Sequence, residues 1–132
     1  MAQDLFGSGP RERLERAAEA VRTIHRILIA RTKSDYERSH GPIRGPYALF
    51  TLLAQDPFFA WLQPMTRAIV EIEEVLGRKD PPVEPKDVEA VSARLEELLS
   101  TPGAAFADRY RELLQSEASL VAEHGRLKSL LA

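Results

Sequence analysis

The prolines of this sequence mark the places where its helices begin. Five of the nine follow a residue suited to an N-cap or an entry turn, and these are Pro10, Pro46, Pro57, Pro85 and Pro102. Proline is well tolerated at the first helical position, because its missing N–H would have no intrahelical partner there. The spacing predicts helices over residues 10–38, 47–54, 57–76, 85–100 and 102–131.

The apolar residues between these prolines repeat with the period of a helix. In segment 10–38 they are three or four residues apart, at Leu14, Ala17, Val21, Ile24 and Leu28. No segment alternates between apolar and polar residues over a useful length, so no sheet is expected. We predict an all-α, single-domain fold over residues 1–132, in which four long helices form an up-down-up-down four-helix bundle.

Residues 47–54 add an extra short helix between the first and second long helices. The segment is almost entirely apolar, so we expect other elements to cover it on several sides.

Pro64 is the one proline that stands inside a predicted helix, 57–76. A proline there removes one backbone hydrogen bond and pushes the preceding residue, Gln63, away from helical geometry. We expect a kink or a break at Pro64 and, beside it, a small pocket lined by Trp61 and closed by Met65.

Composition places the chain among ordinary globular domains. Of its 132 residues 44% are hydrophobic and 29% charged, and the net charge is -2. No apolar run approaches the roughly 18 residues of a membrane span, and the first ten residues do not resemble a signal peptide. The absence of cysteine excludes disulfides and thiolate metal sites and fits a reducing compartment. We expect a cytoplasmic protein that does not bind membranes.

Basic residues gather in the first predicted helix. Residues 1–50 carry nine basic and six acidic side chains, whereas residues 51–100 carry five and ten. Several of the basic residues have an acidic neighbour three or four positions away, as Arg31 has Asp35. Because the chain as a whole is acidic, we expect no nucleic-acid partner.

Glu117 and His124 interrupt the apolar seam of predicted helix 102–131. If helix 10–38 runs antiparallel to it, His25 lies within one turn of Glu117, and we expect a partly buried pair that raises the pKa of His25. The alternative is a half-exposed Glu117, or one paired with an arginine. Glu117 and His124 are about 10 Å apart along a helix, too far to share an ion. We predict no metal and no cofactor.

The loop His40–Pro46 combines two glycines and two prolines with the basic residues His40 and Arg44. Free N–H groups at the start of the next helix favour an anion there. The plainer alternative is that the loop only turns the chain. No pattern of a nucleophile or of a phosphate-binding loop occurs, so no catalytic residue is predicted. A bundle that binds a small molecule or anion at this loop and at the Pro64 pocket, as a binder or a minor enzyme, is our second hypothesis.

Unequal helix lengths predict an association surface. At 1.5 Å per residue, helices 10–38 and 102–131 span roughly 42 to 45 Å, but the other two long helices only about 30 and 24 Å. The overhang leaves an apolar end for a partner, made of Leu14, Leu127, Leu130 and Leu131. Our preferred hypothesis is a non-enzymatic interaction and oligomerisation module, a homodimer that also docks a partner protein's helix.

Overall fold

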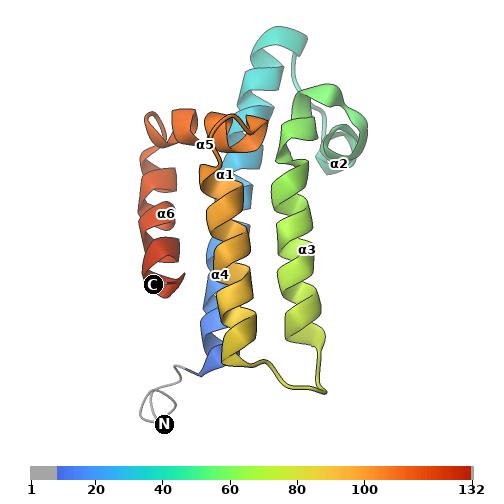
Figure 1. The fold of residues 1–132 in the computed structure, drawn as a ribbon. Helices are drawn as coiled ribbons and strands as arrows, with labels where there is room; N and C mark the ends of the chain where they lie inside the picture. Colours follow the sequence, from blue (N-terminus) through green and yellow to red (C-terminus); the bar gives the residue numbers. More distant parts are fainter. Residues whose placement is uncertain (1–8, 132) are drawn as a thin grey trace.

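A computed structural model describes residues 9–131 of the chain, and these residues are helical without any strand (Figure 1). The prediction of an all-α fold is confirmed for this part of the chain. Six α-helices and one 3₁₀ helix follow in the order α1 Pro10–His40, α2 Pro46–Gln55, η2 Pro57–Leu62, α3 Gln63–Gly77, α4 Pro85–Ser100, α5 Ala105–Leu114 and α6 Ala118–Leu131.

The longest helix, α1, is the element on which the others pack. Its most extensive contacts are with α6 and α3, and it also touches α4 and η2. Figure 1 shows α3 and α4 side by side and running in opposite directions, α5 crossing near the upper end of α4, and α6 returning downward. Helix α2 lies apart from this group, beside the start of α3.

The proline rule places three α-helix starts correctly, and Pro57 is the first residue of η2. Pro10, Pro46 and Pro85 are the first residues of α1, α2 and α4. The start of α4 is fixed further by Asp87, whose carboxylate accepts the backbone N–H of Glu84 at 2.8 Å and a hydrogen bond from Arg78 at 2.6 Å. The connection between α3 and α4 is therefore anchored at both ends.

Pro64 begins an α-helix and does not bend one. The predicted helix 57–76 consists of the 3₁₀ helix η2 followed by α3, and Pro64 lies in the first turn of α3. Asp56 caps η2, because its side chain accepts the backbone N–H of Phe58 at 2.8 Å. Proline fits a first helical turn without losing a hydrogen bond. The sequence predicted a kink or a break at Pro64, and the structure has a break.

The predicted helix 102–131 is wrong, because the chain breaks it into α5 and α6. The turn at residues 101–104 precedes α5, with Gly103 at a φ of 83°. A second break follows at residues 115–117, where the N–H of Glu117 donates to Leu113 at 2.9 Å. A continuous helix would keep Glu117 on the apolar seam, and burying a carboxylate there is costly. The break instead brings Glu117 to Arg31 of α1, 2.8 Å away.

This break also removes the overhang on which the association surface was predicted. Helix α6 has 14 residues and spans about 21 Å. Leu14 and Leu127 are fully buried within the chain, and Leu130 and Leu131 are partly buried against the same core. Leu14 and Leu127 are therefore core residues and not part of an exposed apolar stripe.

Truncating Leu127 should destabilise the single chain. Because its side chain is fully buried, Leu127→Ala should lower the free energy of unfolding by about 2 to 5 kcal/mol. Denaturant titration at several protein concentrations measures this loss, with the exposed Val121→Ala as the control, which should stay within about 0.5 kcal/mol of the unchanged chain. A loss that grows on dilution would instead place Leu127 in an interface between copies.

Candidate functional site

Helix α2 is apolar along its length, yet it buries none of its side chains completely. Residues 46–55 contain no charged side chain, and no side chain of this helix is fully buried. Leu49, Leu52 and Leu53 pack partly against the core, whereas Tyr47 is 84% exposed and Phe50 is 69% exposed. The expectation that other elements cover this helix on several sides is wrong for its outer face.

The outer face of α2 is continuous. Tyr47, Phe50, Thr51 and Ala54 are exposed and are spaced by three, one and three residues, which places them on one side of a helix. We call these four residues the α2 face. Most of the remaining contacts of α2 are with η2, so residues 9–131 leave the α2 face uncovered.

A cleft opens beside the C-terminal half of this face. It has a volume of about 430 Å³ and lies between α1, α2, the end of η2 and the start of α3. Its walls are mostly apolar, and its lining residues are His25, Phe50, Leu53, Ala54, Leu62, Gln63 and Thr66. Because Phe50 and Ala54 belong to both, the cleft and the α2 face form one surface.

The polar groups of the cleft come from α1 and α3. His25 Nε2 lies 3.2 Å from Thr66 Oγ1, and the Thr66 hydroxyl donates to the carbonyl of Leu62 at 3.3 Å. With the Thr66 hydroxyl donating to Leu62, the tautomer of His25 that carries its proton on Nε2 is the one that can donate to Thr66. Gln63 donates through Nε2 to the carbonyl of Leu53 at 3.2 Å, which fastens the end of α2 to the start of α3 and leaves the side-chain oxygen of Gln63 as an acceptor.

His25 and Glu117, predicted to pair, have different partners. Glu117 is 29% exposed and is bound by Arg31, which matches the alternative of a half-exposed carboxylate paired with an arginine. His25 contacts Thr66 instead, and partial burial lowers its pKa. This direction is opposite to the predicted rise in the pKa of His25, because desolvation disfavours the charged ring.

The loop 41–45, where an anion site was predicted, is bound by a carboxylate of the chain itself, that of Glu37. The carboxylate of Glu37 accepts the backbone N–H of Ile43 at 2.8 Å and is paired with Lys33 at 3.3 Å. The hydrogen bond from Ile43 lowers the pKa of Glu37, and Lys33 adds to this effect. Gly41 and Gly45 have φ values of 88° and 93°, a region that glycine enters without strain.

The four residues predicted to bind a ligand do not meet. His40 is exposed and stacks on Tyr36, with ring centroids 4.3 Å apart, and Arg44 is exposed in the loop. Met65 is fully buried in the core. Pro64 does line a hollow of about 420 Å³, which lies between α3, α4 and the start of α5, but neither Trp61 nor Met65 lines it.

Trp61 belongs to η2 and packs against α5. Its ring centroid is 5.4 Å from that of Phe106, and the guanidinium carbon of Arg109 lies 5.2 Å from the Trp61 ring centroid. Trp61 Nε1 and Arg109 Nε are buried without a hydrogen-bond partner among residues 9–131. The cation over the ring face offsets part of the cost of burying these two donors.

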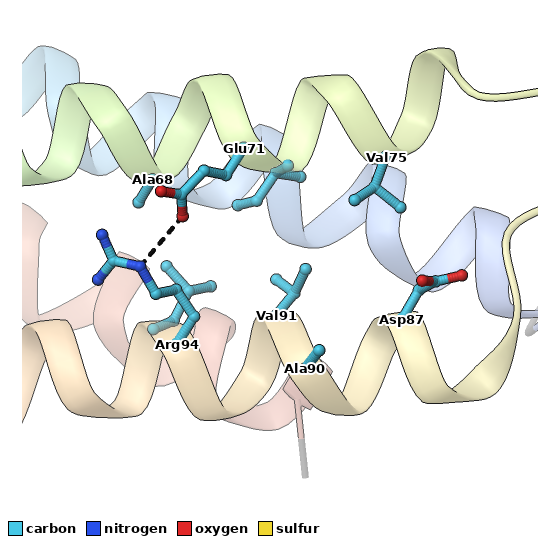
Figure 2. A pocket seen from close by; sticks show the side chains of 9 residues that line it. Ala68, Glu71, Val75, Asp87, Ala90, Val91 and Arg94 are labelled. Carbon is cyan, nitrogen blue, oxygen red and sulfur yellow. Dashed lines mark hydrogen bonds and ion pairs between the residues drawn. The ribbon is translucent and has the colours of Figure 1, made fainter.

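A second hollow lies between α3 and α4 and is shown in Figure 2. It has a volume of about 240 Å³, and Ala68, Ile72, Val91 and Leu95 are among the residues that line it. Glu71 of α3 and Arg94 of α4 form an ion pair of 3.0 Å across it, drawn as a dashed line in Figure 2. Because the chain's own side chains bridge this hollow, we assign it a structural role.

Sequence reasoning missed one further polar contact. Tyr110 Oη and His124 Nδ1 are 2.8 Å apart and connect α5 to α6. Burial raises the pKa of Tyr110, and burial, with Lys128 nearby, lowers that of His124. The interruption of the seam at His124 was the signal for this contact, because a polar residue on a buried face needs a partner.

Neither a metal site nor a similar known protein indicates what the chain does. Within residues 9–131, no group of three or more histidine, aspartate or glutamate side chains is arranged to hold a metal ion. No helix in the same range has the length and apolar character needed to cross a bilayer. No protein family matches the sequence, and no curated protein or solved structure matches it. The function must therefore be argued from the surface of the molecule.

The pKa of His25 gives a test of the cleft. Because burial lowers this pKa below the ordinary value of 6.5, the folded chain takes up a proton less readily than the unfolded chain. The free energy of unfolding should therefore fall as the pH falls through 6.5 toward the folded pKa. NMR titration of the His25 ring measures this directly. Glu117→Gln should leave the His25 pKa unchanged, and a His25 pKa above 6.5 would restore the predicted pair.

Glu37 should control the loop before α2. Glu37→Gln removes the charge that accepts the Ile43 N–H, so hydrogen exchange at the Ile43 amide should become faster. Lys33→Gln is the control and should have a smaller effect, because it leaves the carboxylate that accepts the Ile43 N–H in place. Equal exchange rates in the unchanged chain and in Glu37→Gln would show that the loop does not depend on this carboxylate.

Proposed function

We propose that the chain is a non-enzymatic interaction module that forms a homodimer through the α2 face. The observation that carries this proposal is the exposure of Tyr47 and Phe50, at 84% and 69%, on a helix without charges. Large apolar side chains grouped on one exposed face usually mark an association site. Aromatic residues are also the ones that most often dominate binding energy at such sites.

Charge around α2 favours a second copy in an antiparallel arrangement. Arg44 is exposed just before the helix, and Asp56 ends it. A two-fold axis perpendicular to α2 places the two copies of this helix antiparallel to one another. Each Arg44 then faces the partner's Asp56 and the partially negative C-terminal end of that helix. Because α2 itself carries no charge, the pairing brings no like charges together along its length.

The other helices supply a rigid support for this face. We propose that α1, α3, α4 and α6 form the up-down-up-down four-helix bundle expected from the sequence, with α5 as a connection across one end. The opposite directions of α3 and α4 and the packing of α6 along α1 support this arrangement. In it, α2 is an appendage held by Glu37 at its start and by Gln63 at its end.

Light scattering over a series of protein concentrations tests the dimer. The unchanged chain should approach twice 14.8 kDa as the concentration rises, and Phe50→Glu should remain at the mass of a single chain. Val121→Glu is the matched control, because Val121 is also an exposed apolar residue, at 51%, but lies on α6. The proposal is overturned if the unchanged chain keeps a single-chain mass throughout, or if Val121→Glu dissociates the dimer as Phe50→Glu does.

Binding of a small molecule in the cleft is the second candidate function. The volume of about 430 Å³ and the mostly apolar lining with a few polar groups are typical of small-molecule sites. Native mass spectrometry of freshly purified protein would detect a retained molecule as added mass. Masses that equal one or two bare chains would contradict this candidate. The cytoplasmic location, the docking of a partner's helix and the absence of a nucleic-acid partner stay predictions.

A further inference from the structure

We infer that Tyr47 of each copy inserts into the cleft beside α2 of the other copy. This inference rests on the proposed homodimer and specifies how its two surfaces fit. It assigns Tyr47 as the inserted group and His25, Gln63 and Thr66 as the polar end of the cleft that receives it.

The first step is that α2 carries a projecting group at one end and a hollow at the other. Tyr47 lies in the first turn and is the most exposed large apolar residue of the described chain. Leu53 and Ala54 line the cleft at the last turn. Tyr47 and Ala54 are seven residues apart, about 10 Å along the axis. Because of this distance and its high exposure, Tyr47 lies outside the cleft of its own chain.

The second step is the register of two antiparallel copies. A two-fold axis that is perpendicular to α2 and passes between Phe50 and Thr51 places the α2 face of one copy directly opposite the α2 face of the other. Residue 47 of one copy then lies opposite residue 54 of the other, at the rim of the partner's cleft. The same axis repeats the contact, so one pairing fills both clefts.

The third step is the chemistry of the cleft, which suits a phenol. The ring would lie against Leu53, Leu62 and the face of Phe50, all of which line the hollow. A tyrosine hydroxyl that becomes buried needs a hydrogen-bond partner. The side-chain oxygen of Gln63 is suited to accept its proton, because the amide nitrogen of Gln63 is already engaged with Leu53. A leucine or phenylalanine at position 47 would leave this polar end unmatched.

Dissociation constants of the dimer test the insertion. Tyr47→Ala should raise the dissociation constant at least about thirtyfold, as expected for an aromatic residue that fills a pocket of the partner. Tyr47→Phe should raise it only about two- to tenfold, because it removes one hydrogen bond and keeps the ring. Ala54→Leu should also weaken the dimer, because the longer side chain occupies the cleft. Tyr47 and Ala54 are exposed, so circular dichroism should show an unchanged helix content for all three variants.

An NMR experiment on a mixed dimer locates the ring. One copy is isotope-labelled and the other is not, so that contacts between copies can be separated from contacts within a copy. The inference expects a nuclear Overhauser effect between the Tyr47 ring of one copy and the Thr66 methyl group of the other. A dimer that lacks this contact, and that Tyr47→Ala does not weaken, would overturn the insertion and leave the proposed homodimer in place. Absence of any dimer would overturn both.

Discussion

One continuous buried face of α1 organises the whole molecule. From Leu14 to Thr32 this face is closed to solvent, and the hydroxyl of Thr32 donates to the carbonyl of Leu28 at 2.7 Å, so that even its one polar residue is satisfied. Three buried alanines, Ala17, Ala18 and Ala20, let neighbouring helices approach closely. Because α3, α4, α6 and η2 all contact this helix, their positions relative to one another follow from it.

Charged residues at the C-terminal half of α1 fix the second half of the chain to it. Arg31 binds Glu117 at 2.8 Å, and Asp35 accepts hydrogen bonds from Arg31, Arg38 and Arg109. Isolated surface pairs contribute little to stability, but a network that shares one carboxylate has fixed geometry. Arg109 belongs to α5 and Glu117 precedes α6, so this network holds both helices at the place where the chain turns.

Local signals predicted the starts of α1, α2, η2 and α4 and the buried face of α1, but not the starts of α3, α5 and α6 or the exposure of α2. Helix α4 matches its predicted range because the proline, the capping carboxylate and the apolar period agree there. The break at residues 115–117 was missed because it lets Glu117 avoid burial on the apolar seam and pair with Arg31. Arg31 lies 86 residues away in the sequence. The period of the apolar residues describes one helix at a time, and it contains no information on such a partner.

The candidate site was only partly predictable for the same reason. The sequence predicted a pocket at Pro64, and Pro64 does line a hollow between α3, α4 and α5. The cleft beside α2 was not predicted, because its lining joins His25 of α1 to Ala54 of α2, which only the tertiary fold brings together. The composition of the α2 segment predicts a buried helix. Composition shows how apolar a helix is, but it does not show whether other parts of the chain cover it. The disagreement between its composition and its exposure is what locates the candidate interface.

The position of Trp61 has an optical consequence. It is the only tryptophan of the chain, and it lies against Phe106 and Arg109 at the joint between η2 and α5. Its emission therefore reports whether that joint is closed. The cleft beside α2 is not lined by Trp61, so intrinsic fluorescence follows the integrity of the scaffold separately from association at α2.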